Sequence, residues 1–577
     1  MQNFNSKLRL KENMKKIIPI IFLLLLLVIS SNADSGEMKL LATSEINNKL
    51  YGNGADLFLE IKPGSGRIFI DSFPLTKLDT VMSTRFANEI ACDFIDKDCV
   101  RYDFFYTIRA NTAIVGGPSA GAAISILTIS VLEDIPLRKD AAITGTINSG
   151  GLIGPVSGIK EKATYASKIN MTKVMIPRWS NINETELENM SRKRNIEIKK
   201  VSNLREAFYE MTGVQIGKNY SLIVSSDYVN KMKNISEKIC KRSLETKPQI
   251  INNRTKNADE LFEKGKTAKD QGKYYSSASY CFGANVQYRY ASLLNEDLSE
   301  KDIIEIVNEY KNKSSDFKDF ISRKEIDTIT DLQTLMVVTE RIIDSKEYLD
   351  NSLVELMGNN TNMSVYNLAF GIERLNSAVS WSMFFGDNGK TFEINEKTIK
   401  ESCLEKISEV EERVEYVKQY FPYPSDSVNE EVSYAHRDYN NGDYSLCLFK
   451  ASKAKAEIDI FLNSIGIKKE QLGLLIDERL GQAEQIIGKQ IENNVFPIIG
   501  FSYYEYAKSL KDTDQFSSLL YLEYAIELSK LDIYFKQESF KLPIIEEKYL
   551  ILFGLGFIWG FLVCFIWVRH QFIGKKK

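Results

Sequence analysis

A serine at the entrance of a predicted helix and a lysine on a later helix are the residues of this sequence best suited to chemistry. Ser119 follows a Gly-Gly-Pro turn and opens a small, apolar segment of helical length, 119–132. Free backbone N–H groups and the positive helix end at such a position can stabilise an oxyanion. A serine hydroxyl still needs a base, and Lys162, on a helix with small neighbours, can act as one if burial lowers its pKa.

Three ordered segments around these residues resemble the proteolytic domain of Lon-type proteases, which are serine peptidases with a Ser-Lys dyad. The match runs from about Gly64 to Gly213, and its segments are Gly117-Pro118-Ser119-Ala120-Gly121, Thr144-Gly145 and Pro155-Val156-Ser157-Gly158-Ile159-Lys160-Glu161-Lys162. The resemblance implies an α+β Lon-type proteolytic domain. Together and in family order, the segments are far more specific than any one of them alone.

The resemblance also implies the roles of individual residues. Ser119 would be the nucleophile and Lys162 the general base, with the hydroxyl of Thr144 orienting the lysine amine. Lys160 would not be the base, and residues two apart on a helix do face different sides. Gly117 and Ala120 are the further supporting residues.

The sequence departs from the family pattern in several places. Gly116 stands where many members have an acidic residue, and Ser157 replaces one glycine of a pair. The ATPase module of Lon has no counterpart: Lys264-Gly265-Lys266-Thr267 looks like the end of a phosphate loop, but Glu260 stands five positions before Gly265 and a charged helical run precedes it. We therefore expect peptide hydrolysis without ATP, and no cofactor.

Alternation of apolar residues predicts strands around the proposed site. The stretch 57–71 alternates on both sides of the turn Pro63-Gly64-Ser65-Gly66, which is typical of a β-hairpin. Further strands are predicted at 104–108, 141–144, 173–176 and 196–201, and helices at 78–91, 159–169 and 203–212. A Lon-like proteolytic domain is therefore placed at 37–216.

Beyond Gly217 the sequence is rich in Glu, Lys, Leu, Ala and Tyr, which predicts a helical domain over 217–545. Turns beginning at Gly272 and Gly442, and a weaker one at Asp514, resemble those of tetratricopeptide-like helical hairpins. No 34-residue period connects these turns, so an assembly of antiparallel helical hairpins is favoured over a true repeat array.

The two ends of the chain predict an exported, anchored protein. Basic residues, the apolar run Ile17–Ile29 and the small residues near Ala33 are typical of a signal peptide over 1–33, with an uncleaved anchor as the alternative. The uncharged segment 549–568 is long enough for a transmembrane helix, and 569–577 would be a basic cytoplasmic tail. We therefore expect the protein at the cell membrane, with a single C-terminal span and its main domains extracellular.

The glycosylation sequons and the cysteines are typical of an extracellular protein. Nine Asn-x-Ser/Thr sequons suit a glycoprotein, and six cysteines precede the predicted span. Cys92 and Cys99 are the only close pair, and a disulfide is favoured over zinc because Cys-x6-Cys with no second pair nearby is a poor zinc pattern. The order of secreted domain, helical region and anchor resembles that of predicted archaeal surface serine proteases.

The composition argues against nucleic-acid binding and against a metal site. A net charge of −3 gives no field that would hold nucleic acid, and two histidines leave little room for a metal site. The sequence thus predicts a membrane-anchored, ATP-independent serine endopeptidase that acts on peptides or unfolded proteins. The resemblance also allows a homo-oligomer, since Lon-type domains form rings. The alternative is a catalytically inactive Lon-like scaffold whose helical half binds partners.

Overall fold

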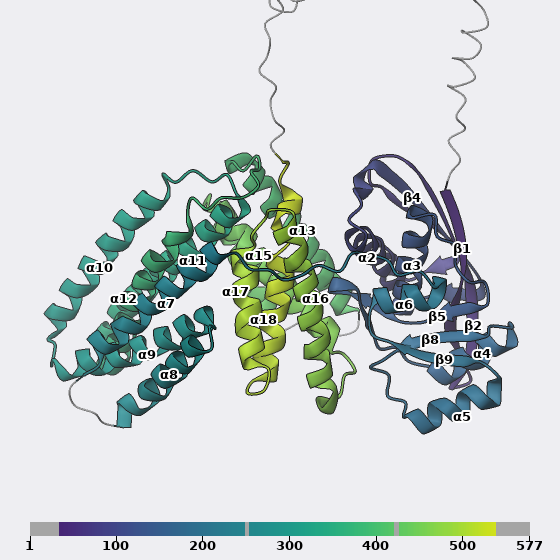
Figure 1. The fold of residues 1–577 in the computed structure, drawn as a ribbon, viewed down its shortest axis with the longest axis horizontal. Helices are drawn as coiled ribbons and strands as arrows, with labels where there is room; N and C mark the ends of the chain where they lie inside the picture. The colour runs from purple at the N-terminus through teal and green to yellow at the C-terminus, as the bar shows by residue number, and fades with distance from the viewer. Residues whose placement is uncertain (1–33, 249–252, 420–425, 538–577) are drawn as a thin grey trace, which may run out of the picture.

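The structure is a computed structural model that describes residues 34–248, 253–419 and 426–537. An α+β part comes first along the chain and a helical part follows it, and the two lie side by side (Figure 1). The predicted signal peptide, transmembrane segment and basic tail lie outside the described residues.

No helix within the described ranges is long and apolar enough to cross a membrane. Helix α3 (Gly121–Leu132) is wholly apolar or small, but it has only 12 residues, which is about 18 Å of helix against a hydrocarbon core of about 30 Å. The longest helix, α11 (Ile329–Met357), carries several charged side chains. The predicted fold class is therefore corrected: an α+β part followed by a helical part agrees with the structure, but the transmembrane helix is not part of the described fold.

The first sheet has four strands in the order β1-β2-β4-β3. Strands β1 (Asp34–Ile46) and β2 (Lys49–Pro63) form a hairpin whose turn, Asn47-Asn48, has positive φ at both residues, a conformation that asparagine tolerates well. β4 (Tyr102–Val115) pairs with β2 antiparallel and with β3 (Ile68–Thr76) parallel.

The hairpin predicted across Pro63–Gly66 is therefore wrong, because β4 lies between β2 and β3. The turn instead binds the start of β4. The carboxylate of Asp103 accepts hydrogen bonds from the backbone N–H of Ser65 at 2.8 Å and of Arg67 at 3.1 Å. Alternation correctly located both strands, but it carries no information on which strand each one pairs with.

The remaining elements of the α+β part surround the proposed site. A second, parallel sheet has the order β5-β8-β9, and β6 and β7 form a short antiparallel pair. The elements, in chain order, are α2 (Leu78–Phe94), α3, β5 (Ala141–Ile143), β6 (Thr146–Asn148), β7 (Leu152–Gly154), α4 (Ile159–Lys168), β8 (Lys173–Pro177), α5 (Glu184–Arg194), β9 (Glu197–Val201) and α6 (Leu204–Thr212).

The helical part consists of helices joined mostly by short turns. They are α7 (Ser226–Thr246), α8 (Asn253–Asp270), α9 (Tyr274–Asn295), α10 (Glu300–Ile321), α11, α12 (Thr361–Trp381), α13 (Glu396–Lys418), α14 (Asp426–Asn440), α15 (Tyr444–Ser464), α16 (Leu472–Glu492), α17 (Ile498–Leu510) and α18 (Gln515–Leu528). Gly272 and Gly442, both with positive φ, form the turns before α9 and α15. One disulfide, Cys240–Cys281, joins α7 to α9, and another, Cys403–Cys447, joins α13 to α15.

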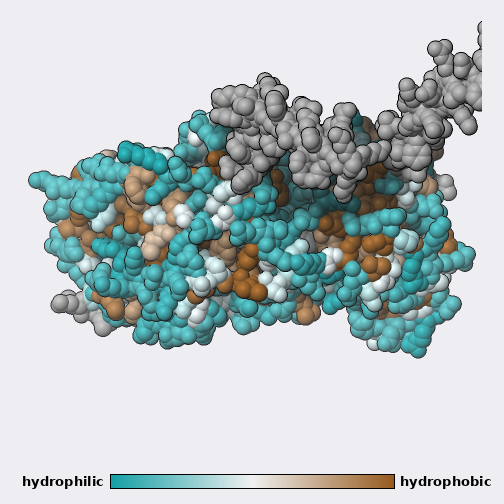
Figure 2. Space-filling view, turned by 45° about the horizontal axis from the view of Figure 1, so that its top comes forward, coloured by the Kyte–Doolittle hydropathy of each residue, from teal (hydrophilic) through white to brown (hydrophobic). Residues whose placement is uncertain are grey.

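The hydrophobic core of the helical part continues into the α+β part. Met82 and Phe86 of α2 and Leu152 of β7 belong to the same buried cluster as the apolar side chains of α13, α15 and α16. On the surface, hydrophilic side chains cover most of the face shown in Figure 2, and hydrophobic ones gather in a few patches, the broadest over the α+β part on the right. The two parts are thus packed together through buried apolar surface.

Candidate active site

The proposed nucleophile lies at the junction of β4 and α3. Gly117 has a φ of 107°, which favours glycine, and it leads into a single 3₁₀ turn, Pro118–Ala120, before α3 begins. Ser119 is half-buried. A Cβ atom added to Gly121 would lie 3.0 Å from the backbone nitrogen of Ile147, so this glycine lets α3 approach β6 closely.

Thr144 and Gly145 join this turn to the second sheet. The N–H of Thr144 donates to the carbonyl of Met175 in β8 at 3.1 Å, and the N–H of Gly145 donates to the carbonyl of Ser119 at 3.0 Å. The hydroxyl of Thr144, which is fully buried, also lies 3.4 Å from the Ser119 carbonyl. The segment is therefore fixed to the backbone of the proposed nucleophile.

Lys162 reaches the same point from the first turn of α4. Its Nζ donates to Oγ1 of Thr144 at 3.1 Å, and only 3% of the residue is exposed. Burial lowers the pKa of Lys162 to about 8, because an ammonium group loses its hydration there. No carboxylate of the described residues forms an ion pair with it.

Lys160 has the opposite surroundings. It is exposed, it forms an ion pair with Glu186 of α5, and this contact raises its pKa. The expectation that the two lysines face different environments therefore agrees with the structure. Only Lys162 is placed near Ser119 and Thr144.

The hydroxyl of Ser119 makes no direct hydrogen bond to Lys162 among the contacts of the described residues; Thr144 contacts the backbone carbonyl of Ser119 and the amine of Lys162. Gly117, expected to support the site, has its N–H occupied, since it donates to the carboxylate of Asp79 at 3.0 Å. Asp79, in the first turn of α2, was missed by the sequence analysis. No motif marks it, because its proximity to Gly117 arises from the packing of α2.

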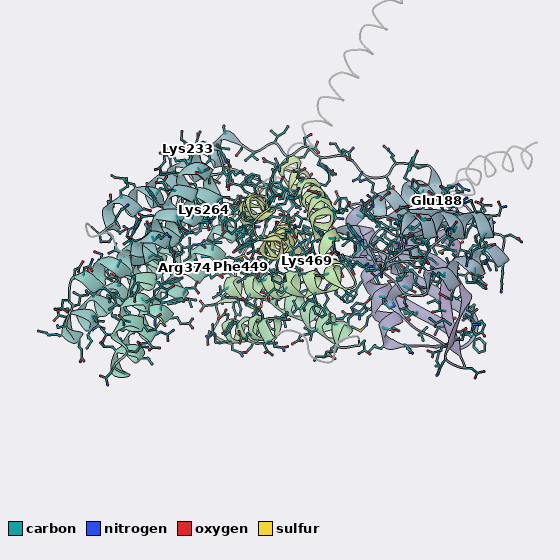
Figure 3. All side chains as sticks on the ribbon, turned by 90° about the horizontal axis from the view of Figure 1, so that it is seen from below. Glu188, Lys233, Lys264, Arg374, Phe449 and Lys469 are labelled. Carbon is teal, nitrogen blue, oxygen red and sulfur yellow. A yellow bond between two sulfur atoms is a disulfide. The ribbon has the colours of Figure 1, made fainter. Side chains whose placement is uncertain are left out.

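The structure also shows what lies beside Gly116, one of the positions at which this sequence departs from the family pattern. A Cβ atom added to Gly116 would lie 2.5 Å from Cδ of Lys77, so the lysine side chain fills the space where many Lon proteases have an acidic residue. The four residues that look like a phosphate loop lie within helix α8, and Lys264 lies in the helical part (Figure 3). The reading of that motif as a helix surface agrees with this position.

The structure also places the close cysteine pair and the possible metal-ligating side chains. Cys92 and Cys99 are bonded, with an S–S distance of 2.07 Å, and close the loop between α2 and β4. Over the described ranges, no group of three or more His, Cys, Asp or Glu side chains is arranged to hold a metal ion.

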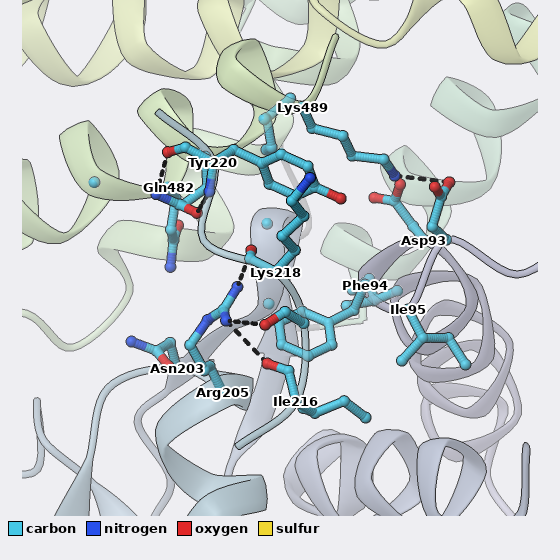
Figure 4. A pocket seen from close by; sticks show the side chains of 18 of the residues that line it. Asp93, Phe94, Ile95, Asn203, Arg205, Ile216, Lys218, Tyr220, Gln482 and Lys489 are labelled. Carbon is cyan, nitrogen blue, oxygen red and sulfur yellow. Dashed lines mark hydrogen bonds and ion pairs between the residues drawn. The ribbon is translucent and has the colours of Figure 1, made fainter. Parts of the chain in front are cut away.

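A cavity of about 390 Å³ lies where the two parts meet (Figure 4), and Ser119 is not among the residues that line it. Phe94 and Ile95 at the end of α2, Arg205 of α6 and side chains of α16 line it, together with Gly150 and Gly151. Arg205 donates to the carbonyls of Ile216 at 2.9 Å and Gly217 at 3.0 Å, which fixes the segment that leaves the α+β part. This cavity therefore borders the loop between β6 and β7.

Comparison with known proteins identifies the α+β part. Residues 105–212 match the family model of the Lon protease (S16) C-terminal proteolytic domain. The Lon protease of Methanosphaera stadtmanae is 28% identical over 137 residues, which are 24% of this chain and 16% of that protein. The Lon protease of Mycoplasma mobile is 31% identical over 134 residues, covering 22% and 16%. The resemblance to a Lon-type proteolytic domain is thus confirmed for these residues, while the chain spans 16% of the length of these relatives.

The predicted location is not supported by these findings. A further relative, 34% identical over 117 residues, is a peroxisomal Lon protease homolog 2 of Caenorhabditis elegans, and the match covers 20% of this chain and 14% of that protein. No helix in the part of the chain that the structure describes can cross a membrane. The prediction of a protein at the cell membrane with extracellular main domains is therefore withdrawn, and the segments on which it depends, 1–33 and 549–568, lie outside the described residues.

Proposed function

We propose that this chain is a serine-type endopeptidase that uses Ser119 as nucleophile and Lys162 as general base. The observation that carries the proposal is the buried amine of Lys162, with a pKa of about 8 and the hydroxyl of Thr144 as its hydrogen-bond partner. A lysine in such surroundings is partly neutral near physiological pH and can accept a proton. The match of residues 105–212 to the Lon proteolytic domain supports the same assignment.

The proposed reaction has two steps. In the first, the hydroxyl proton of Ser119 passes to Lys162 while the serine oxygen attacks the peptide carbonyl; the C–N bond then breaks, and Lys162 returns the proton to the departing amine. In the second, Lys162 takes a proton from a water molecule that attacks the acyl-serine ester; the bond between the acyl carbon and the serine oxygen then breaks, Lys162 returns the proton to that oxygen, and the peptide leaves with a new carboxyl group. The backbone N–H of Ala120, in the turn before α3, would stabilise the oxyanion, since the N–H groups of Gly121 and Ala122 already donate to the carbonyls of Pro118 and Gly145.

We further propose that peptides and unfolded proteins are the substrates and that hydrolysis needs no ATP. The phosphate-loop-like residues within α8 offer no loop that could cradle a nucleotide phosphate. Folded proteins should therefore resist cleavage by this chain, because helix α8 offers no nucleotide-driven means of unfolding them. Assembly into a homo-oligomer remains a prediction from the family resemblance.

The rival function is an inactive Lon-like scaffold. It is favoured by the occupied N–H of Gly117 and by the absence, among the described contacts, of a hydrogen bond between Ser119 and Lys162. In an active enzyme, substrate binding must bring those two groups together, as catalytic hydrogen bonds often tighten only in the complex.

Labelling of the purified full chain with a serine-reactive phosphonate separates the two functions. We expect labelling and nucleotide-free cleavage of an unfolded protein, with both lost in Ser119→Ala while circular dichroism stays unchanged. Labelling at another residue would overturn the assignment of the nucleophile. A wild-type chain that neither reacts nor cleaves would establish the scaffold.

A further inference from the structure

The helical part contacts the active-site region through a buried polar cluster. Ser149, at the tip of the β6–β7 hairpin, is surrounded by three side chains of the helical part, and we call these four residues the Ser149 cluster: Ser149, Asn463, Arg479 and Glu523. Arg479 of α16 and Glu523 of α18 form an ion pair in which both side chains are almost fully buried, at 0% and 2% exposure. Burial of such a pair demands that its remaining hydrogen-bonding groups find partners.

Ser149 supplies several of those partners. Arg479 donates through Nη1 to the carbonyl of Ser149 at 2.7 Å and through Nη2 to its hydroxyl at 2.8 Å. The hydroxyl in turn donates to Oε2 of Glu523 at 2.9 Å. Asn463 of α15 donates to the other oxygen of Glu523 at 2.8 Å. One residue of the α+β part is therefore bound by three helices of the helical part.

The hairpin that carries Ser149 leads directly to the proposed site. Strand β6 begins at Thr146, immediately after Gly145, and Gly145 donates to the carbonyl of Ser119. Ile147 of β6 also lies against Gly121 at the start of α3. A displacement of Ser149 would thus be passed to Thr144 and to the helix that follows Ser119.

A second contact holds the other side of the site. Helix α2, whose Asp79 binds Gly117, lies against α13 and α15: Glu89 is 3.6 Å from Arg413 and 3.7 Å from Lys455. The guanidinium of Arg413 lies over the ring of Phe86 at 4.5 Å. The helical part therefore contacts both α2 and the β6–β7 hairpin, and both of these elements contact the turn of Ser119 or the residues beside it.

We propose that the helical part is a structural component of the active site, and that Arg479 is a positioning residue that acts on Thr144 and Lys162 through the β6–β7 hairpin. The catalytic meaning of this inference rests on the proposed function. Its structural content, that Arg479 holds residues 144–154 in place, can be measured without any activity.

The test compares two variants with a matched control in the full chain. Arg479→Gln removes the guanidinium, and Ser149→Ala removes a single hydroxyl while leaving the Arg479–Glu523 pair intact. Glu373→Gln is the control, because Glu373 is also almost fully buried, at 1% exposure, and pairs with Arg242 and Arg289 wholly within the helical part. The readouts are amide hydrogen exchange of residues 144–154 and the pH dependence of phosphonate labelling.

We expect exchange of residues 144–154 to rise by about tenfold in Ser149→Ala and more in Arg479→Gln. Labelling near neutral pH should slow by about tenfold or more. Its midpoint should move upward from about 8, because water that enters the loosened site rehydrates Lys162. The control should change neither readout, although it weakens the helical part.

Unchanged exchange in Ser149→Ala would overturn the inference, as would equal changes in the control. If Arg479→Gln does not fold, Ser149→Ala decides alone. A wild-type chain that does not react with the probe would refute the proposed function, and exchange would still show whether the helical part holds the hairpin.

Discussion

Lysine side chains are buried in both parts of the molecule, but the two parts surround them differently. In the α+β part, Lys162 contacts a hydroxyl group, and burial lowers its pKa to about 8. In the helical part, Lys406 is equally buried; burial alone would lower its pKa, but the carboxylates of Glu409 and Glu527 raise it well above its ordinary value.

The difference shows what decides the role of a buried amine. A carboxylate partner keeps the amine charged and makes it a structural element, whereas a neutral partner lets it release a proton. Lys455, which shares the carboxylates of Lys406, also has a raised pKa. Lys162 therefore differs from its counterparts in the helical part by its partner rather than by its burial.

The largest effect should come from replacing Lys162 with arginine, whose side chain cannot give up its proton and so cannot act as a base. Because a guanidinium stays charged, Lys162→Arg should lower kcat/KM for peptide cleavage by about a thousandfold. The matched control, Lys160→Arg, should stay within about twofold of wild type, since an exposed ion pair contributes little. Near-normal turnover in Lys162→Arg would remove the general base from the proposal.

A second variant would give Lys162 the kind of partner that Lys406 has. In Thr144→Asp a carboxylate replaces the hydroxyl, so the pKa of Lys162 should rise and kcat/KM near pH 8 should fall about a hundredfold below that of Thr144→Asn. The asparagine variant controls for loss of the threonine itself. Equal activity of the two would show that charge at Thr144 does not govern the amine.

The third test removes the buried amine of Lys406 in the helical part. Lys406→Met leaves Glu527 buried without one of its cations, so the free energy of unfolding should fall by about 3–5 kcal/mol. Urea denaturation followed by circular dichroism measures it. A loss below about 1 kcal/mol would mean that Lys455 compensates the cluster alone.

Replacing Lys162 with methionine should instead increase the free energy of unfolding, and this should be the smallest of the four effects. Folding lowers the pKa of Lys162, so below about pH 8 the folded chain holds a buried charge that costs stability. Lys162→Met should therefore raise the free energy of unfolding by about 1–3 kcal/mol at pH 7. The gain should shrink as pH rises from about 8 towards 10.5, where only the unfolded wild type still binds the proton. A loss of stability at pH 7 would contradict the lowered pKa.

The residues of the candidate site could be selected from the sequence because each lies in a short, ordered motif. Ser119, Thr144 and Lys162 are far apart in the chain, yet their order matches one family pattern, and two contacts join them in the structure. Asp79 and Lys77 could not be predicted in the same way. They reach Gly117 and Gly116 only because α2 packs beside the turn, and packing leaves no local pattern.

The fold was predicted less evenly. Alternation located β3 and β4, and glycines at the turns located the helical hairpins before α9 and α15. Strand pairing was missed because an alternating strand fits any neighbour that offers an apolar face. The contact of Ser149 with α16 and α18 was also beyond reach, since it joins residues more than 300 positions apart.

The two disulfides of the helical part reveal a doubled plan. Each joins the first and third helices of a set, α7 with α9 and α13 with α15, and in each a glycine turn precedes the third helix. Three more helices follow in both sets, ending in the hairpins α11–α12 and α17–α18. The second set supplies the contacts to Ser149, whereas α10 and α12 of the first set lie away from the α+β part (Figure 1). The two sets are therefore constrained differently, and surface substitutions in α10 and α12 should be tolerated more readily than substitutions at the contacts of α16 and α18 with Ser149.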